Sequence, residues 1–262
     1  MSQFRFIDRG YEDSMLLIPG WAADSGIFEP LDLPFNYFLP ENISPLIFDE
    51  EFIKSADEFI AARISRHCED AKHPKQSKRD CFVGLRPPRN DGLKTPGLHL
   101  FGWSMGGFIA AHLAAKYTTM FKSVTLVSVR RRYEKKVIEK IKGNIRRNAR
   151  AYLYKFYEGL FSESEEGNRR WFKAKLLERY TTEMSEQVLL EGLDYLSRTE
   201  LECDGLARPG IMFIHGDADP IAPIEEAKAV REGLPQAKFF SINGACHLPF
   251  LRKEFADRFS NE

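Results

Sequence analysis

The chain has few cysteines, and they form no metal-binding pattern. Its 262 residues include four cysteines, at positions 68, 81, 203 and 246, and none of them forms a Cys-x-x-Cys pair. Structural zinc sites and disulfide frameworks both need cysteines that are closely spaced or numerous. We therefore expect no metal site and no disulfide framework, and we expect a reducing compartment.

Long apolar runs and a surplus of charge are also missing. No segment approaches the roughly 20 apolar residues of a membrane span, and the opening Met-Ser-Gln-Phe-Arg lacks the apolar core of a signal peptide. The 38 basic and 38 acidic residues cancel, whereas bulk binding of nucleic acid needs a basic surplus. The sequence predicts a soluble, cytoplasmic, monomeric protein with neither nucleic acid nor membrane as its partner.

Short apolar segments alternate with longer amphipathic ones along much of the chain. We predict strands at residues 15–18, 35–39, 98–101, 124–128, 211–215 and 238–242. We predict helices at residues 49–66, 108–115, 224–232 and 249–260. This alternation predicts an α/β fold with a mostly parallel sheet flanked by helices.

Two stretches interrupt the alternation. Residues 67–97 contain scattered prolines and little periodicity, which predicts a long surface excursion. Residues 129–205 show helical patterning and no convincing strand, with one helical face formed by Val137, Ile141, Ile145 and Ala149. We therefore predict a core formed by residues 1–128 and 206–262, with residues 129–205 inserted as a helical cap.

The most informative motif is Gly-Trp-Ser-Met-Gly-Gly at residues 102–107, between a predicted strand and a predicted helix. A serine on such a turn needs a strained backbone and small neighbours, and Gly102 and Gly106 supply them. The pattern Gly-x-Ser-x-Gly is weak alone, but a strand before it and a helix after it make it specific. We interpret the segment as a nucleophile elbow with Ser104 as the nucleophile.

An acid and a histidine follow Ser104 in the chain order of α/β-hydrolases, each at the end of a predicted strand. A serine hydroxyl needs a base to accept its proton, and His247 is the candidate. A carboxylate must then orient and stabilise the imidazolium, which is the role predicted for Asp219. Asp217 competes for this role, because the spacing alone does not exclude it. A Gly-x-x-Asp with proline four positions later resembles the hydrolase motif and favours Asp219.

Two backbone amides are expected to stabilise the oxyanion. One belongs to Met105, directly after the nucleophile, and the other to Trp21, in the loop after the first core strand. Neither this chemistry nor the serine nucleophile requires a metal or another cofactor. The other histidines and Cys246 are better explained as packed or surface residues, since no partners accompany them in the sequence.

Three motifs together resemble the pimeloyl-acyl-carrier-protein methyl ester esterases of biotin synthesis. They are Leu-Ile-Pro-Gly-Trp at residues 17–21, Phe-Gly-Trp-Ser-Met-Gly-Gly at 101–107 and Ala-Cys-His-Leu-Pro-Phe at 245–250. The resemblance implies a carboxylesterase that removes a methyl group from pimeloyl carried on acyl-carrier protein. Three departures are Pro-Gly where many relatives have His-Gly, a different loop at residues 39–45, and the added residues 67–97.

The predicted cap supports an acidic partner independently. Residues 128–150 contain ten Lys or Arg residues against two Glu, and acyl-carrier proteins are acidic. The resemblance implies that cap arginines bind the carrier; the candidates are Arg131, Arg132, Arg146, Arg147 and Arg150. The simpler alternative is a solvated cationic helix face. Apolar cap residues would enclose the acyl chain: Tyr152, Phe156, Tyr157, Leu160 and Trp171.

Two other functions fit the same residues. A small-molecule esterase, thioesterase or carbon–carbon bond hydrolase would keep the triad and use the basic cap to recognise free carboxylates. A non-catalytic binding protein would keep the fold alone.

Overall fold

The computed structural model of the protein describes residues 4–40, 58, 97–201 and 203–259. Its strands are β1 (Phe4–Ile7), β2 (Ser14–Ile18), β3 (Asn36–Pro40), β4 (Leu98–Trp103), β5 (Phe121–Val127), β6 (Ile211–Gly216) and β7 (Lys238–Ile242). Its α-helices are α2 (Met105–Lys116), α3 (Lys135–Glu158), α4 (Glu166–Phe172), α5 (Glu178–Thr182), α6 (Glu186–Arg198), α7 (Ile224–Glu232) and α8 (Lys253–Ala256). The predicted helix at 49–66 and the excursion at 67–97 lie outside the described residues, apart from Glu58 and Gly97.

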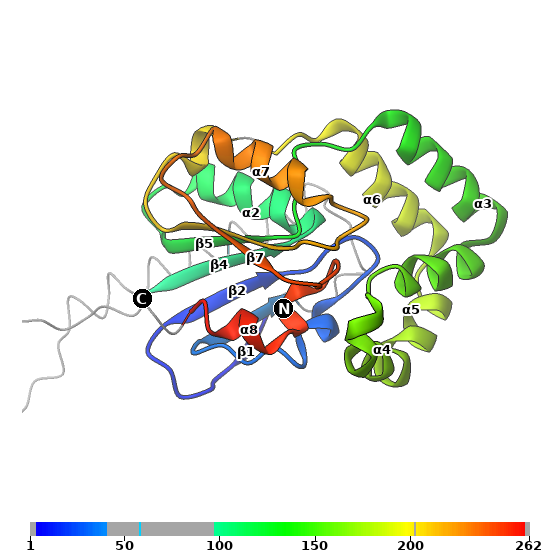
Figure 1. The fold of residues 1–262 in the computed structure, drawn as a ribbon, viewed down its shortest axis with the longest axis horizontal. Coiled ribbons are helices and arrows are strands. Elements are labelled where there is room, and N and C mark those ends of the chain that lie inside the picture. Colours follow the sequence, from blue (N-terminus) through cyan, green and yellow to red (C-terminus); the bar gives the residue numbers. More distant parts are fainter. Residues whose placement is uncertain (1–3, 41–57, 59–96, 202, 260–262) are drawn as a thin grey trace, which may run out of the picture.

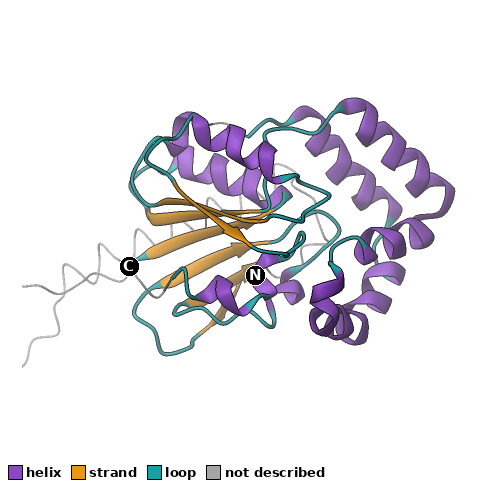
Figure 2. Ribbon diagram, in the orientation of Figure 1, coloured by secondary structure: helices purple, strands orange, loops and turns teal. Residues whose placement is uncertain are grey.

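The described strands form one mostly parallel sheet in the order β1-β3-β2-β4-β5-β6-β7 (Figure 2). Only β1 runs antiparallel to its neighbour, pairing with β3. All residues of β2, β4 and β6 are buried, as expected of strands covered on both faces. The predicted fold class is therefore confirmed, and the six predicted strands are present.

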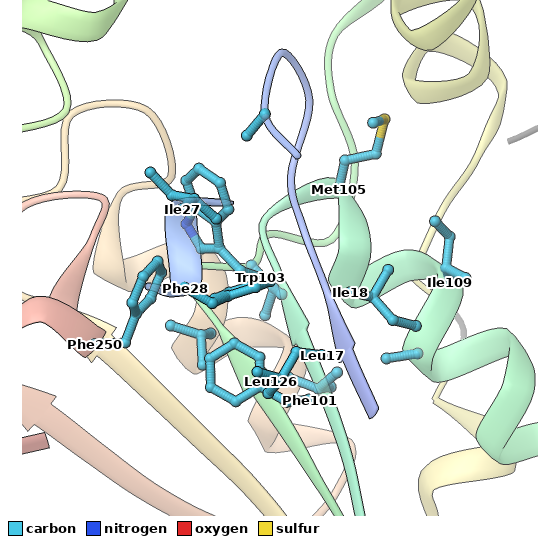
Figure 3. Packing of buried hydrophobic residues seen from close by; sticks show 14 of the residues in the cluster. Leu17, Ile18, Ile27, Phe28, Phe101, Trp103, Met105, Ile109, Leu126 and Phe250 are labelled. Atoms are coloured by element: carbon cyan, nitrogen blue, oxygen red, sulfur yellow. The ribbon is translucent and has the colours of Figure 1, made fainter. Parts of the chain in front are cut away.

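Helices cover both faces of the sheet (Figure 1). On one face α2 packs against β4 and β5, and α7 packs against β6. On the other face, aromatic rings pack beneath β4, with Phe101 5.6 Å from Phe28 and Trp103 5.6 Å from Phe250 between ring centroids. Figure 3 shows these rings on one side of the strands and Ile109 of α2 on the other. This two-sided packing fixes the end of β4, where Ser104 follows.

The helices α3 to α6 come between β5 and β6 in the chain and lie beyond the carboxyl ends of the strands (Figure 1). Several hydrogen bonds join them to the loop after β2. The Trp21 indole donates to the Leu189 carbonyl at 3.0 Å, and the Tyr157 hydroxyl donates to the Ala22 carbonyl at 2.7 Å. This helical segment therefore lies at the same edge of the sheet as Ser104.

The predicted inward face of α3 is wrong at Val137, which is 46% exposed, while its neighbour Ile138 is buried. Lys142 explains the error: it is buried on the same helix face as Ile138, but a lysine contributes nothing to an apolar pattern. Its Nζ pairs with Glu139 and Asp194 while its stem packs inward. The helix is also interrupted at Asn148, whose φ of −166° and ψ of 90° are not helical.

The predicted helix at 249–260 is also wrong. The structure has a 3-10 turn at Pro249–Leu251 and one helical turn in α8, separated by Arg252 with an extended backbone (φ −88°, ψ 142°). Strand β1 was not predicted, because its four residues Phe-Arg-Phe-Ile are too short for a periodic signal. No helix among the described residues is long and apolar enough to cross a membrane.

Candidate active site

Ser104 sits at the turn from β4 into α2 with a φ of 54° and a ψ of −119°. Such a left-handed conformation is costly for a non-glycine residue and must be held by its surroundings. The flanking glycines allow the close packing that does this. A Cβ on Gly102 would lie 2.4 Å from the Gly106 carbonyl oxygen, and one on Gly106 would lie 2.3 Å from the Ile18 carbonyl oxygen. The sequence therefore folds this serine onto a tight, strained turn.

Backbone strain is concentrated at one edge of the sheet. In the described part of the chain, Ala22, Ser104 and Ser128 are the non-glycine residues with positive φ. They follow the neighbouring strands β2, β4 and β5 at their carboxyl ends. Strained residues collect at functional sites, and the carboxyl edge of a parallel sheet is the usual place for one. This edge is therefore the candidate active site.

His247 connects Ser104 to Asp219 at this edge. The His247 Nδ1 and the Asp219 Oδ2 are 2.7 Å apart, and the His247 Nε2 and the Ser104 Oγ are 2.9 Å apart. With Nδ1 donating to the carboxylate, Nε2 is left to accept the Ser104 hydroxyl proton. All three side chains are buried. The structure thus brings together the three residues that the sequence singled out for the triad.

Asp219 is held as an ionised acceptor. Its Oδ1 accepts hydrogen bonds from the backbone amides of Ile221 at 2.9 Å and Ala222 at 3.0 Å. Burial by itself would raise the pKa of Asp219, but His247 and the Ala222 amide outweigh burial and hold the pKa below its ordinary value of 3.8. Burial lowers the pKa of the adjacent His215, which donates to the Ala222 carbonyl at 2.6 Å. Asp219 is therefore a carboxylate wherever the protein is near neutral pH.

Asp217, the competing acid, is directed elsewhere. It is exposed, and its Oδ1 accepts a hydrogen bond from the Gly244 amide at 2.7 Å. That contact ties the loop after β6 to the turn after β7. The structure therefore places Asp219, and not Asp217, against His247.

The loop that carries His247 is fixed from two sides. From the core, the Trp103 indole donates to the His247 carbonyl at 2.7 Å. From the helical segment, the Leu160 carbonyl accepts from the His247 amide at 3.3 Å, and the Glu165 carboxylate accepts from the Cys246 amide at 3.1 Å. Burial raises the pKa of the Cys246 thiol to about 11, which leaves it a protonated, packed side chain.

The predicted oxyanion donors lie on both sides of the serine. Met105 is the first residue of α2, where backbone amides lack an intrahelical partner and the helix dipole favours negative charge. Trp21 follows Gly20, whose added Cβ would lie 3.0 Å from the Ser104 Cβ. The loop that carries the Trp21 amide therefore passes directly beside the nucleophile.

Together these groups can perform nucleophilic acyl transfer. Ser104 has a base within hydrogen-bonding distance, the base has an ionised orienting group, and two backbone segments flank the nucleophile. The described residues contain no group of three or more His, Cys, Asp or Glu arranged to hold a metal ion.

Residues 91–254 match the protein family described as alpha/beta hydrolase fold. The chain belongs to this family.

Several curated relatives of this hydrolase-fold chain have the same name. This chain is 24% identical over 269 residues to the pimeloyl-[acyl-carrier protein] methyl ester esterase of Xanthomonas campestris pv. campestris strain B100. The match covers 92% of this chain and 90% of that protein. This chain is 23% identical to the protein of the same name from Nitrosomonas europaea, with 96% and 95% covered. The resemblance found in the motifs therefore extends over nearly the whole chain.

Solved structures show the same fold. A bromoperoxidase from Bacillus anthracis superposes with a TM-score of 0.71 at 18% identity, covering 98% of this chain and 93% of that one. An esterase from Exiguobacterium antarcticum superposes with a TM-score of 0.67 at 17% identity, covering 98% and 94%. The hydrolase fold of the chain is therefore shown independently of the serine motif.

A charged contact joins the loop after β2 of the hydrolase to α5. Asp24 accepts hydrogen bonds from the Arg179 guanidinium, from the Tyr180 hydroxyl at 2.6 Å and from the Gly26 amide at 2.8 Å. Burial by itself would raise the pKa of Asp24, but these hydrogen bonds outweigh burial and lower the pKa below 3.8. The contact therefore stabilises the folded protein only while Asp24 is ionised.

We expect Asp24→Asn to lower the free energy of unfolding by about 2 kcal/mol at pH 7, because charged hydrogen bonds are lost. A carboxyl group whose pKa is lowered by folding stabilises above its unfolded pKa and loses this effect as pH falls through its folded pKa. The difference between wild type and variant should therefore shrink below about pH 3.8. Urea unfolding from pH 7 to pH 3 measures the free energy of unfolding of both proteins.

The control is Asp32→Asn, because Asp32 is an 83% exposed partner of Arg9. An equal loss of unfolding free energy in both variants would contradict the interpretation.

A pocket of 690 Å³ lies between α3 and the loop that follows Asp219. Its lining combines polar and apolar side chains: Asn144, Arg147, Asn148, Ala151, Tyr152, Lys155, Phe156, Gly159, Pro220 and Ile221. The Phe156 ring also lies edge-on to the Trp21 ring at 5.1 Å between centroids. The pocket therefore borders the loop that follows Asp219 and carries two basic groups, and one of its lining rings contacts Trp21.

The five arginines proposed for carrier binding occupy different environments. Arg147 lines the pocket, and Arg146 is exposed beside it on α3. Arg150 pairs with Glu178 at 3.1 Å, and Arg131 pairs with Glu200. Arg132 is exposed next to Arg131. The structure thus brings only Arg147 to the pocket and gives two of the other four an acidic partner.

One residue at the site was not singled out from the sequence. Tyr133 follows β5, and its ring lies 6.3 Å from the ring of Phe108, one turn along α2 from Ser104, between centroids. Burial raises the pKa of Tyr133 to about 12, so the phenol keeps its proton. The only available signal was its place a few residues beyond the carboxyl end of a predicted strand, within a run of basic residues.

Proposed function

We propose that the protein is a serine carboxylesterase that acts through an acyl-enzyme. The observation that carries the proposal is the hydrogen-bonded series of Ser104, His247 and Asp219 at the strained turn after β4. Ser104 attacks the ester carbonyl while His247 takes its proton and then passes it to the departing alcohol. Water, activated by His247, releases the acid. The backbone amides of Trp21 and Met105 stabilise the two oxyanions.

The substrate that we propose is the methyl ester of pimeloyl-acyl-carrier protein, as an intermediate of biotin biosynthesis in the cytoplasm. The name of the curated relatives supports it. The pocket beside the loop that follows Asp219 offers apolar side chains for an acyl chain, and Arg147 and Lys155 for an acidic carrier. In this proposal residues 129–205 act as a helical cap on the core.

The test is hydrolysis of purified pimeloyl-acyl-carrier-protein methyl ester beside free dimethyl pimelate, at low and high salt. We expect fast cleavage of the carrier-bound ester that slows as salt screens the attraction between the carrier and the basic cap. Fast cleavage of the free ester with no preference for the carrier would remove the biotin assignment and leave a small-molecule esterase. A protein that cleaves neither ester, and whose Ser104 resists a fluorophosphonate, would fit the non-catalytic alternative.

Charge reversal at Arg147 tests the carrier surface. We expect Arg147→Glu to raise KM for the carrier-bound ester about 10-fold and to leave turnover of free dimethyl pimelate within about 2-fold, because only the acidic carrier uses the charge. Steady-state kinetics at low salt measures both values. Lys228→Glu, an exposed charge reversal on α7, is the matched control. Equal effects of the two reversals would contradict a carrier site at Arg147.

A further inference from the structure

The loop after β2 carries the proposed oxyanion donor on a strained backbone. Trp21, whose amide is that donor, precedes Ala22, which has a φ of 58°. An alanine stays in this left-handed region only when its surroundings hold it there, because its Cβ crowds the backbone. Gly20 lies beside the nucleophile, since a Cβ added to it would lie 3.0 Å from the Ser104 Cβ. A small change in the backbone of residues 20–22 would therefore turn the Trp21 amide relative to Ser104.

A side chain of α3 holds this strained backbone. The Tyr157 hydroxyl donates to the Ala22 carbonyl oxygen at 2.7 Å, and both residues are buried. The Met184 Sδ lies 3.5 Å from the same hydroxyl, but a thioether is a weak acceptor and a hydroxyl has a single proton. The carbonyl is therefore the main acceptor. Burial raises the pKa of Tyr157 well above its ordinary value of 10, so the phenol remains a donor.

The Tyr157 ring is fixed by two aromatic rings from neighbouring helices. The ring centroids of Phe172 and Tyr180 lie 5.2 Å and 5.8 Å from that of Tyr157, and 5.9 Å from each other. In a regular α-helix, residues eight positions apart point about 80° away from each other. The π-helical turn at Lys173–Leu177 lies between Phe172 and Tyr180, and its wider turn brings both rings onto one face. This irregularity therefore builds the aromatic cluster against which Tyr157 packs.

The same cluster also holds the next part of the loop. The Tyr180 hydroxyl donates to Asp24 Oδ1 at 2.6 Å, and the Asp24 amide donates to the Tyr180 hydroxyl at 3.2 Å. Tyr152 and Phe156 line the pocket, whereas the Tyr157 hydroxyl is directed at the loop. Tyr157 is therefore placed to act on the loop after β2 rather than on an acyl chain.

We propose that Tyr157 is a positioning residue, whose hydrogen bond to the Ala22 carbonyl keeps the Trp21 amide aimed at the oxyanion. The inference rests on the proposed esterase function. During attack, a Ser104 lone pair forms the bond to the acyl carbon, the serine proton moves to His247 Nε2, and the carbonyl π electrons move to the oxygen that becomes the oxyanion. Tyr157 keeps its proton and touches no reacting atom. The helical segment thereby forms part of the oxyanion site.

The test is Tyr157→Phe, which removes the hydroxyl and keeps the ring against Phe172 and Tyr180. We expect kcat/KM for a p-nitrophenyl ester to fall about 10-fold. This is less than the roughly 100-fold to 1000-fold effect of deleting an oxyanion donor, because the Trp21 amide stays and is only misdirected. A trifluoromethyl ketone, which Ser104 converts to a hemiketal oxyanion, should bind about 10-fold more weakly. The corresponding secondary alcohol cannot form that charge, and its affinity should change less than about 2-fold.

The matched control is Tyr37→Phe. Tyr37 is also a buried tyrosine, and its hydroxyl accepts from the Leu33 amide at 2.7 Å and donates to the Leu31 carbonyl at 3.1 Å. This variant should lose stability towards urea, because it loses hydrogen bonds of the core. It should keep its kcat/KM per active site, with active sites counted by complete labelling with a fluorophosphonate.

Two results would overturn the proposal. One is a Tyr157→Phe enzyme whose kcat/KM per active site is within about 2-fold of wild type, and the other is an equal loss of affinity for the ketone and the alcohol. Counting active sites keeps the comparison valid when part of the variant is unfolded. Failure of the wild-type protein to react with the fluorophosphonate at Ser104 would instead overturn the esterase function.

Discussion

Ester hydrolysis should fall by about a million-fold in Ser104→Ala, because the proposed nucleophile is lost and no side chain replaces it. His247 and the oxyanion amides would remain, so slow general-base hydrolysis sets the residual rate. Release of p-nitrophenol under single-turnover conditions measures the loss, and circular dichroism verifies that the variant is folded. Turnover at the parental rate would remove this mechanism.

A second set of Ser, His and Asp side chains in the chain provides an unusually close control. His99 Nδ1 lies 2.7 Å from the Ser123 Oγ, and His99 Nε2 lies 3.1 Å from Asp13. Ser123 is within β5, not on a strained turn at the start of a helix, and its φ is not positive. We expect Ser123→Ala to keep kcat/KM within about 2-fold, since the same residue types without the elbow and oxyanion amides do not catalyse.

Asp219→Asn should reduce kcat by about 10⁴-fold while leaving KM nearly unchanged. An amide in place of the carboxylate can donate to His247 Nδ1, which turns the imidazole to the tautomer that cannot accept the serine proton. It also removes the negative charge that stabilises the imidazolium. Burst kinetics with a p-nitrophenyl ester would show the loss in the acylation step.

Asp217→Asn is the natural companion to that variant. The two acids are two residues apart, yet Asp217 is exposed and accepts only from the Gly244 amide among the contacts described. We expect a loss of less than about 3-fold, since an asparagine oxygen can still accept that hydrogen bond. The reverse order, with Asp217→Asn the more damaged enzyme, would contradict the assignment of the acid role to Asp219.

Much of the core could be predicted because its residues carry local signals. The buried parallel strands are continuous apolar runs, and the elbow glycines around Ser104 are required by contacts that admit no Cβ. Strand β1 could not be predicted, since its four residues gain their structure by pairing with β3. The same limit applies at 249–260, where Arg252 adopts an extended backbone within an apparently helical pattern.

In the site, the order of Ser104, Asp219 and His247 along the chain was sufficient to select them, because each follows a strand whose carboxyl end must reach the same edge. The preference for Asp219 over Asp217 rested on motif resemblance, and the structure supplies the distances. Tyr133 could not have been found this way. Its ring reaches Phe108 of α2 only through the path of the chain between β5 and α3, which no periodicity encodes. Among the arginines, Arg131 and Arg150 differ from Arg147 because they pair with acids far away in the sequence, and the sequence alone could not predict those pairs.

The strand order has a consequence for how the site assembles during folding. Ser104 and His247 are 143 residues apart, and β6 and β7 must add to the edge of β5 before His247 can reach the serine. Contacts of such long range form late, whereas a segment such as α3 to α6 is built largely from local contacts. We expect the helical segment to fold before the chain has any catalytic activity. Activity would then appear last, with the final strand, so that recovered turnover during refolding reports completion of the whole sheet.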